Sequence, residues 1–366
     1  MGDPTAKLTD DVLVEIISRV PYKSTCSCKC VSRRWRDIIS HPEHRKKLPQ
    51  TLAGFFYEAR ISSTEKARYF INVSGEGDPL IDASLSFLPE YESLDILDCC
   101  NGLLLCRCWK PTDPETLDYV VCNPATEKWV VVPSTEWSSE VEVARLGFDP
   151  AVSSHFHVFE FIDEVAWGVE TLSYYDPHIE ALAIYSSKAG VWTHRRVLED
   201  EDPLVEDEDP LNSKGVFLNG ILHLAACFEL VVAVDVEGKN WQFISIPDQS
   251  YFDDVPVSDI FLSQGRLHFA EGAAEWSLKH KVTNLQLFGS EYSSFRHDYS
   301  VIAFHPERGM IFMVCGSENV LMSYEMGSKK LCFIHEFGCD CYLKLDERTP
   351  YFPYIPLFSE SLADEN

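Results

Sequence analysis

The hydrophobic pattern of this chain changes near residue 50, from a helical period to a strand period. In the first part, apolar side chains recur at i, i+3, i+4 and i+7, which predicts an amphipathic helix. The four positions are Leu13, Ile16, Ile17 and Val20. Thr9 can cap this helix, and Pro21 ends it because a proline ring cannot continue the backbone hydrogen bonding.

A second amphipathic helix is predicted directly afterwards, with arginines around its apolar side. The residues predicted to share its apolar face are Val31, Trp35, Ile38 and Ile39. The helix is predicted to stop at His41-Pro42. A segment of about 35 residues cannot bury two apolar helix faces by itself. These faces must therefore meet the rest of the chain or a partner protein.

From about residue 50 onward, short runs rich in Val, Ile, Phe, Tyr and Trp predict β-strands separated by tight turns. The runs form a degenerate repeat, in which a Gly-centred turn opens a buried strand and a Trp opens the outer strand. One copy runs from Asn101 to Pro133, and another runs from Asn219 to Pro247. Sheets with two apolar faces must stack on neighbours, and radial closure protects their edges. We therefore predict a β-propeller.

The strand count predicts six blades, with seven as the alternative. Five sheets are predicted near 94–132, 145–197, 215–246, 257–288 and 299–337. The strands left over, at 52–57, 67–73, 342–345 and 351–357, are predicted to form a sixth sheet shared by both ends of the domain. The predicted fold class is α+β multidomain, with a helical module at 1–48, an all-β propeller at 49–360 and a disordered tail at 361–366.

The charge of the chain is uneven, and this limits its partners. The net charge is −27, but residues 1–50 carry ten Lys or Arg and six Asp or Glu, a net +4. The acidic remainder repels phosphate, so we expect no nucleic-acid partner, whereas the basic module favours an acidic protein. The sequence shows neither a long apolar span nor a signal-peptide core, so we expect no membrane partner and a cytoplasmic and/or nuclear location.

The residues that could carry chemistry form no catalytic pattern, so we do not expect an enzyme, a metal or another cofactor. The 13 cysteines include the Cys-x-Cys sets 26/28/30, 106/108 and 339/341, whose spacing fits tetrahedral zinc poorly. We expect reduced thiols that act as small apolar residues. His155 and His157 are expected on one polar or solvent-facing side of a strand. His223 and His268 share a repeat position, and each can bond a backbone carbonyl.

Tryptophans and acidic residues give the candidates for partner contact. Trp129, Trp192 and Trp241 share a repeat position and are expected to pack the blades, whereas Trp109, Trp137 and Trp167 are expected in loops. The segment 198–210 holds eight carboxylates and is expected to be an exposed loop, either a solvated linker or an arm for basic targets. The candidate target-binding residues are Trp167, Tyr174, Glu206 and Asp207.

The helical segment also resembles a known family. Residues 8–21 (LTDDVLVEIISRVP) and 29–40 (KCVSRRWRDIIS) resemble an F-box of the plant type, although Tyr22 and Thr25 depart from its pattern. The repeats over 50–360 resemble the kelch-like F-box-associated domain of plant proteins. The resemblance implies the substrate receptor of a Skp–cullin–F-box ubiquitin ligase. The F-box would bind a Skp-type adaptor, which joins a cullin and a RING subunit, and the propeller would hold a target protein for ubiquitin-dependent degradation.

The same resemblance implies a set of adaptor-contacting residues. They are Leu8, Leu13, Ile16, Ile17, Pro21, Cys30, Val31 and Trp35, with Lys29, Arg33 and Arg34 as charge complements. Some of these must form the core of the module itself, and the sequence does not separate the two sets. Two other functions remain open. One is a scaffold or decoy that binds the adaptor without supporting degradation, and the other is a propeller enzyme or sugar-binding lectin.

Overall fold

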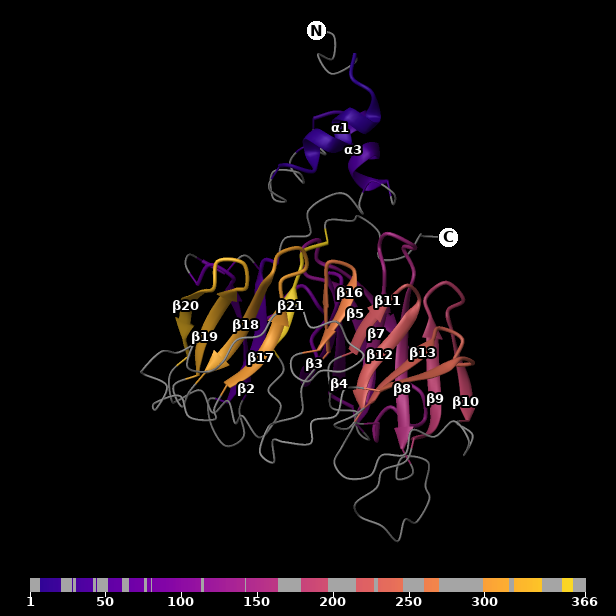
Figure 1. Cartoon of the computed structure of the whole chain (residues 1–366). Coiled ribbons are helices and arrows are strands. Elements are labelled where there is room, and N and C mark those ends of the chain that lie inside the picture. The colour runs from indigo at the N-terminus through magenta and orange to yellow at the C-terminus, as the bar shows by residue number, and fades with distance from the viewer. Residues whose placement is uncertain are drawn as a thin grey trace.

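The structure is a computed structural model in which the described residues include a pair of helices and a set of radially arranged sheets (Figure 1). The described residues are 7–20, 28, 31–41, 44, 52–60, 66–75, 78–79, 81–112, 115–141, 143–163, 179–196, 215–226, 230–245, 260–269, 299–315, 319–337 and 351–357. The helices are α1 (Asp10–Ile17) and α3 (Arg33–Ser40). Within the described part of the chain, no helix is long and apolar enough to cross a membrane.

In the part of the chain that is described, four sheets have four strands each, and neighbouring strands pair antiparallel in chain order. The first contains β3 (Ser93–Cys100), β4 (Leu103–Lys110), β5 (Thr116–Asn123) and β6 (Lys128–Val132). The second contains β7 (Val143–Phe148), β8 (Phe156–Asp163), β9 (Ile179–Ser186) and β10 (Val191–Arg196). The third contains β11 (Gly215–Leu218), β12 (Ile221–Ala226), β13 (Leu230–Asp235) and β14 (Trp241–Ser245). The fourth contains β17 (Tyr299–Phe304), β18 (Met310–Cys315), β19 (Val320–Glu325) and β20 (Lys330–Glu336).

Two further sheets are smaller. One is the two-stranded pair β15 (Ile260–Ser263) and β16 (Arg266–Phe269). The other joins both ends of the domain in the order β2-β1-β21, with β1 at Gly54–Arg60, β2 at Lys66–Asn72 and β21 at Phe352–Tyr354. The first strand of each sheet contacts the first strand of the next, from β3 through β7, β11 and β15 to β17, and β21 contacts β3. This radial arrangement is that of a β-propeller.

The predicted count of six blades, with seven as the alternative, does not hold for the described residues. They form five sheets of three or more strands, and the sheet predicted near 257–288 is a pair of two strands. The remainder of that range lies largely outside the described residues, because 270–298 is not described. The other predicted sheets agree closely with the observed strands, since 94–132 corresponds to β3–β6 and 299–337 corresponds to β17–β20.

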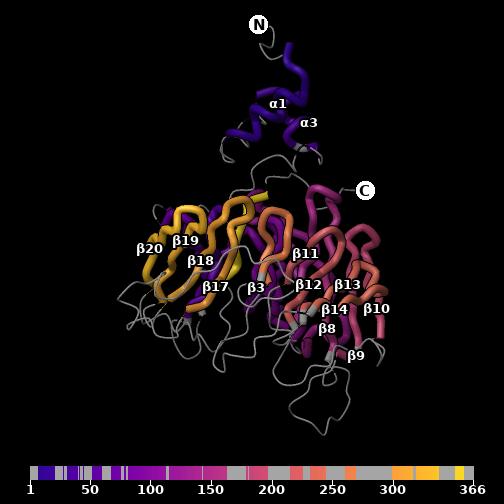
Figure 2. The backbone as a smooth tube through the Cα atoms, viewed as in Figure 1, coloured from indigo at the N-terminus to yellow at the C-terminus, as the bar shows by residue number. Residues whose placement is uncertain are grey.

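The prediction that the two ends of the domain share a sheet is confirmed by strand pairing. Gly54 pairs with Tyr354, and Phe56 pairs with Phe352, in antiparallel register. Phe55 from β1 also packs with Phe312 from β18 in one apolar cluster, so the terminal sheet meets the sheet of β17–β20. Figure 2 shows the strands from the two ends of the domain lying side by side. The predicted strand at 342–345 lies outside the described residues.

The repeated turns have the backbone geometry that the sequence predicts. Asn101 and Gly102 both have positive φ, at 48° and 89°, as do Asn219 and Gly220. Such angles are typical of the two-residue hairpin turns that favour Asn-Gly. At Gly102 there is a second constraint, because an added Cβ would lie 2.5 Å from the carbonyl oxygen of Ile355. The C-terminal segment therefore passes directly over the turn between β3 and β4.

The tryptophans only partly follow the prediction. Trp129, Trp192 and Trp241 open the outer strands β6, β10 and β14, although Trp129 remains 38% exposed. Trp192 donates from Nε1 to the Pro133 carbonyl oxygen at 2.7 Å. Trp109 was expected in a loop but lies in β4, because β4 and β5 continue pairing as far as Lys110 and Thr116. Trp137 does lie in a loop, half-buried and in ring contact with His194.

Deletion of residues 345–366 should destabilise the whole propeller, because it removes β21. Tyr351, Phe352, Tyr354 and Leu357 are all buried, and each buried side chain of this size contributes roughly 1.5–3 kcal/mol. The stabilisation lost with these side chains is comparable to the whole free energy of unfolding of a typical domain, about 5–15 kcal/mol. Thermal unfolding of the truncated and full-length chains measures this. Deletion of 358–366 alone is the control that retains β21, and wild-type stability in the longer deletion would contradict the closure.

Candidate functional site

The two N-terminal helices pack against each other through a small core of their own. Leu13, Val14 and Ile17 from α1 meet Ile38 and Ile39 from α3, and all five are at most 4% exposed. Cys28 and Trp35 pack against the edge of this cluster. Among the described residues, the cluster that buries one face of each helix contains no propeller side chain, so the expectation that these faces must meet the rest of the chain or a partner does not hold for them. Two of the predicted adaptor contacts, Leu13 and Ile17, belong to this core.

A second set of apolar residues in the module faces outward. Leu8 is 37% exposed, Val12 and Ile16 are each 45% exposed, and Val31 is 64% exposed. Val12 and Ile16 are spaced four residues apart, so they follow one flank of α1, whereas Leu8 precedes α1 and Val31 precedes α3. We call these four residues the apolar stripe. Exposed apolar side chains on a small helical module are candidates for contact with a partner.

Two residues of the predicted apolar faces are exposed. Ile16 was grouped with Leu13 and Ile17 on one apolar face, but the buried face of α1 uses Val14 beside Leu13 and Ile17. Val31 was grouped with Trp35, Ile38 and Ile39 on one side of the second helix, but it precedes α3 and is the most exposed member of the stripe. Val12 was not predicted at all. The signal that could have found it was its spacing of four from Ile16.

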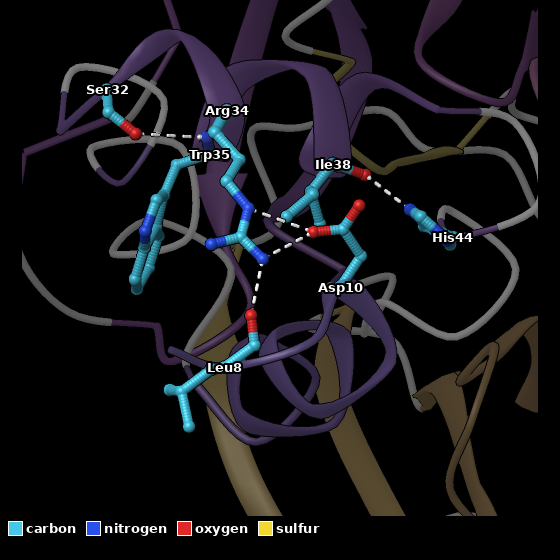
Figure 3. Close-up of polar contacts among 7 residues, drawn as sticks. All are labelled: Leu8, Asp10, Ser32, Arg34, Trp35, Ile38 and His44. Atoms are coloured by element: carbon cyan, nitrogen blue, oxygen red, sulfur yellow. Dashed lines mark hydrogen bonds and ion pairs between the residues drawn. The ribbon is translucent and has the colours of Figure 1, made fainter. Parts of the chain in front are cut away.

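Polar contacts hold the ends of the two helices in place (Figure 3). The Arg34 guanidinium donates from Nε and Nη2 to Oδ1 of Asp10, at 2.9 and 2.7 Å, and from Nη2 to the Leu8 carbonyl oxygen at 2.5 Å. Ser32 caps α3 by accepting from the Trp35 backbone N–H at 3.2 Å. His44 contacts the Ile38 carbonyl oxygen through Nδ1 at 3.1 Å. Thr9 occupies the N-cap position of α1 without a side-chain cap bond.

The remaining predicted adaptor-contacting residues differ in how much of their surface a partner could reach. Arg33 is exposed and Trp35 is half-buried, so both retain surface that a partner could reach. Arg34 is used inside the module rather than projecting freely, since its ion pair joins α3 to Asp10. Pro21, Lys29 and Cys30 lie outside the described residues, as do Tyr22 and Thr25.

The polar groups buried in the propeller have structural partners. His223 contacts the Val216 carbonyl oxygen at 3.2 Å, and His268 contacts the Ser263 carbonyl oxygen at 3.1 Å, which confirms the expectation for this pair. Glu160 is fully buried, and both Thr135 (2.8 Å) and Ser138 donate their hydroxyl groups to it. Burial raises the pKa of Glu160 above its ordinary value. This buried carboxylate was not predicted from the sequence.

The cysteines and the other candidate ligands form no site in the part of the chain that is described. Cys106 and Cys108 are free thiols buried on one face of β4. Burial raises the pKa of Cys108 far above its ordinary value, which leaves this thiol protonated and unreactive. His155 and His157 are both half-buried rather than solvent-facing. Within the described ranges, no group of three His, Cys, Asp or Glu residues is arranged to hold a metal ion.

The predicted target-binding residues lie outside the described residues. This applies to Trp167, Tyr174, Glu206 and Asp207, and to the whole acidic segment 198–210.

Comparison with known families agrees with both parts of this architecture. The F-box domain model matches residues 6–47, which include α1, α3 and the apolar stripe. The model described as "F-box protein At3g26010-like, beta-propeller" matches residues 81–355. The chain belongs to this family of F-box proteins. Its helical module is the F-box, and its body is the family's β-propeller.

The F-box protein also resembles individual plant proteins. It is 27% identical over 301 residues to F-box protein At5g07610 from Arabidopsis thaliana, which covers 78% of this chain and 68% of the relative. It is 24% identical over 366 residues to the putative F-box/kelch-repeat protein At1g15680 from the same plant, covering 89% and 83%. Among solved structures, TolB from Acinetobacter baumannii matches with a TM-score of 0.42 at 10% identity, covering 84% of this chain and 69% of TolB.

Truncation of buried and exposed residues of α1 should have different effects on stability. Ile17→Ala should lower the free energy of unfolding of the F-box by about 2–5 kcal/mol, because it leaves a cavity in the core. Ile16→Ala should change it by less than about 1 kcal/mol, because this side chain is 45% exposed. Helical circular dichroism during urea unfolding measures both. Equal losses in the two variants would show that Ile16 is part of the core.

The propeller should lose stability in mild acid, and His305 should contribute to this loss. Burial holds the pKa of His305 at about 4, and its Nδ1 accepts from the backbone N–H groups of Glu307 and Arg308, each at 3.2 Å. A histidine in the unfolded chain takes its proton near pH 6.5, so stability is lost as the pH falls from about 6.5 towards 4. His305→Asn keeps an acceptor but does not titrate. It should flatten this part of the pH–stability curve.

Proposed function

We propose that the F-box protein is the substrate receptor of a Skp–cullin–F-box ubiquitin ligase. The single observation that carries this proposal is the apolar stripe, formed by Leu8, Val12, Ile16 and Val31. The F-box completes its own core with other residues, so burial inside the module does not account for the stripe. A partner with an apolar surface would cover it. In proteins with this domain, that partner is a Skp-type adaptor.

The charge distribution supports the same assignment. Residues 1–50 carry a net +4, while the chain as a whole carries −27. A basic module attracts an acidic adaptor over a distance of several ångströms, and this attraction increases the rate of association more than the final affinity. The apolar stripe would then supply most of the binding energy, as buried apolar anchors do at other interfaces.

The propeller would serve as the platform for a target protein. The adaptor would link the F-box to a cullin and a RING subunit, and the target would be held close to the ubiquitin-charged enzyme. Proximity of this kind raises the effective concentration of the reacting groups without any acid, base or nucleophile from this chain. We therefore propose a binding protein rather than an enzyme, located in the cytoplasm and/or the nucleus.

A ubiquitin-transfer assay with a reconstituted ligase distinguishes a substrate receptor from a scaffold or decoy. The full chain, a purified Skp-type adaptor, a cullin and a RING subunit would be combined with proteins captured by the propeller in cells with blocked proteasomes. Transfer of ubiquitin to a captured protein, dependent on this chain, supports the receptor. Adaptor binding without transfer to any captured protein supports the scaffold.

Contact between the F-box and the adaptor can be tested by substitution of residues in the apolar stripe. Val12→Ser combined with Ile16→Ser should weaken binding of a purified Skp-type adaptor by roughly 30-fold or more, because interface anchors contribute about 2 kcal/mol or more. Isothermal titration of the full chain measures this. Val152→Ser is the matched control, since Val152 is a 69% exposed valine on the propeller. Unchanged adaptor affinity in the double variant would rule out the stripe as the contact surface.

A further inference from the structure

Arg34 makes a three-point contact between the two helices of the F-box, and this contact has a consequence for adaptor binding. Two of its nitrogens reach the same carboxylate oxygen of Asp10, at 2.9 and 2.7 Å. Nη2 also donates to the Leu8 carbonyl oxygen at 2.5 Å. Figure 3 shows the guanidinium lying between these two acceptors. Hydrogen bonds between charged groups are stronger and more directional than neutral ones.

The Leu8 contact matters because Leu8 lies outside α1. The helix begins at Asp10, and its first backbone bond runs from the Leu13 N–H to the Thr9 carbonyl oxygen at 3.1 Å. The helical hydrogen bonds therefore do not hold Leu8 in place. Arg34 supplies a bond to its backbone, and the neighbouring Asp10 fixes the orientation of the guanidinium. Leu8 is one of the four residues of the apolar stripe, so the same contact holds the backbone of one member of this surface.

We propose that Arg34 is a positioning residue for the adaptor-binding surface, acting through Leu8 with Asp10 as its counter-ion. This inference rests on the proposed adaptor binding. It replaces the simpler expectation that Arg34 pairs directly with an acidic group of the adaptor. The Arg34 side chain is 32% exposed and that of Asp10 is 58% exposed, so the ion pair contributes modestly to folding. Its main effect is on the geometry of the stripe.

The two roles of Arg34 predict opposite results for Asp10→Asn. If Arg34 bound an acidic adaptor directly, removal of its internal counter-ion would release the guanidinium and strengthen binding. If Arg34 positions Leu8, the same change loosens the guanidinium and weakens binding. We expect Asp10→Asn to raise the Kd for a purified Skp-type adaptor by about three- to tenfold in the full chain. Arg34→Ala should raise the Kd by at least as much.

Asp11→Asn is the matched control. Asp11 lies in the same first turn of α1, carries the same charge and is exposed. Its neutralisation removes one negative charge from the module, as Asp10→Asn does, but leaves the contact between Arg34 and Asp10 intact. The adaptor Kd should change by no more than about twofold. Asp10→Glu should largely retain wild-type binding, because it keeps a carboxylate for Arg34.

A double-mutant cycle with Leu8 separates positioning from a general loss of structure. In the Leu8→Ala background, the stripe no longer has its first side chain, so Asp10→Asn should change the adaptor Kd by less than about twofold. In the Ile16→Ala background, the full effect of Asp10→Asn should remain. If Asp10→Asn only unfolded the module, its effect would be equally large in both backgrounds.

Each outcome has a distinct meaning. Tighter or unchanged adaptor binding by Asp10→Asn, together with weaker binding by Arg34→Ala, would overturn the positioning role and establish direct contact. An equal effect of Asp10→Asn with and without the Leu8 side chain would also overturn it. Failure of the wild-type chain to bind the adaptor would instead overturn the proposed function, and the positioning role with it.

Discussion

The propeller depends on one antiparallel contact between segments that are far apart in the sequence, the pairing of β1 with β21. Gly54 and Tyr354 lie opposite each other in this pairing. Closing a loop of about 300 residues costs roughly 5 kcal/mol in chain entropy, because the cost grows with the logarithm of loop length. The buried side chains of 351–357 offset this cost, since each contributes roughly 1.5–3 kcal/mol. The closure therefore needs the apolar residues beside the strand as well as its few backbone bonds.

Side-chain contacts reinforce this closure from the neighbouring sheet. The buried Asn123 donates from Nδ2 to the Leu357 carbonyl oxygen at 2.7 Å, and the Cys99 thiol donates to the Pro353 carbonyl oxygen at 3.4 Å. Gly102 leaves the space through which this segment passes. The sheet of β3–β6 thus binds the last strand on the side opposite β1. A ring fixed at its ends in this way can carry loops of different sequence without loss of its core.

The features that repeat from sheet to sheet could be predicted from the sequence, whereas features that occur once in the fold could not. The turn at Asn101 and Gly102 was predictable because two residues with positive φ restrict the choice of amino acid. The strand at Trp109 was missed because this residue lies outside the repeated Trp position, whereas pairing with β5 extends β4 as far as Lys110. Glu160 was missed because its two hydroxyl donors come from a loop more than 20 residues earlier. A buried acid is recognisable only once its partners are known.

The candidate site was also predicted only in part from the sequence. A period of 3.6 residues indicates that α1 has an apolar side, but it does not say which flank of that side the second helix covers. Ile16 and Ile17 are adjacent and both isoleucine, yet only Ile17 contacts α3 residues in the core. The net charge of the module is equally ambiguous. An arginine that forms an ion pair inside the module adds the same charge to this sum as an arginine that contacts a partner protein. Arg34 contributes to the positive charge of the module, which would attract an acidic adaptor, while its contacts hold the backbone of Leu8, part of the apolar surface that the adaptor would cover. In the proposed roles, a single residue would assist both the approach and the fit of a partner without contacting it.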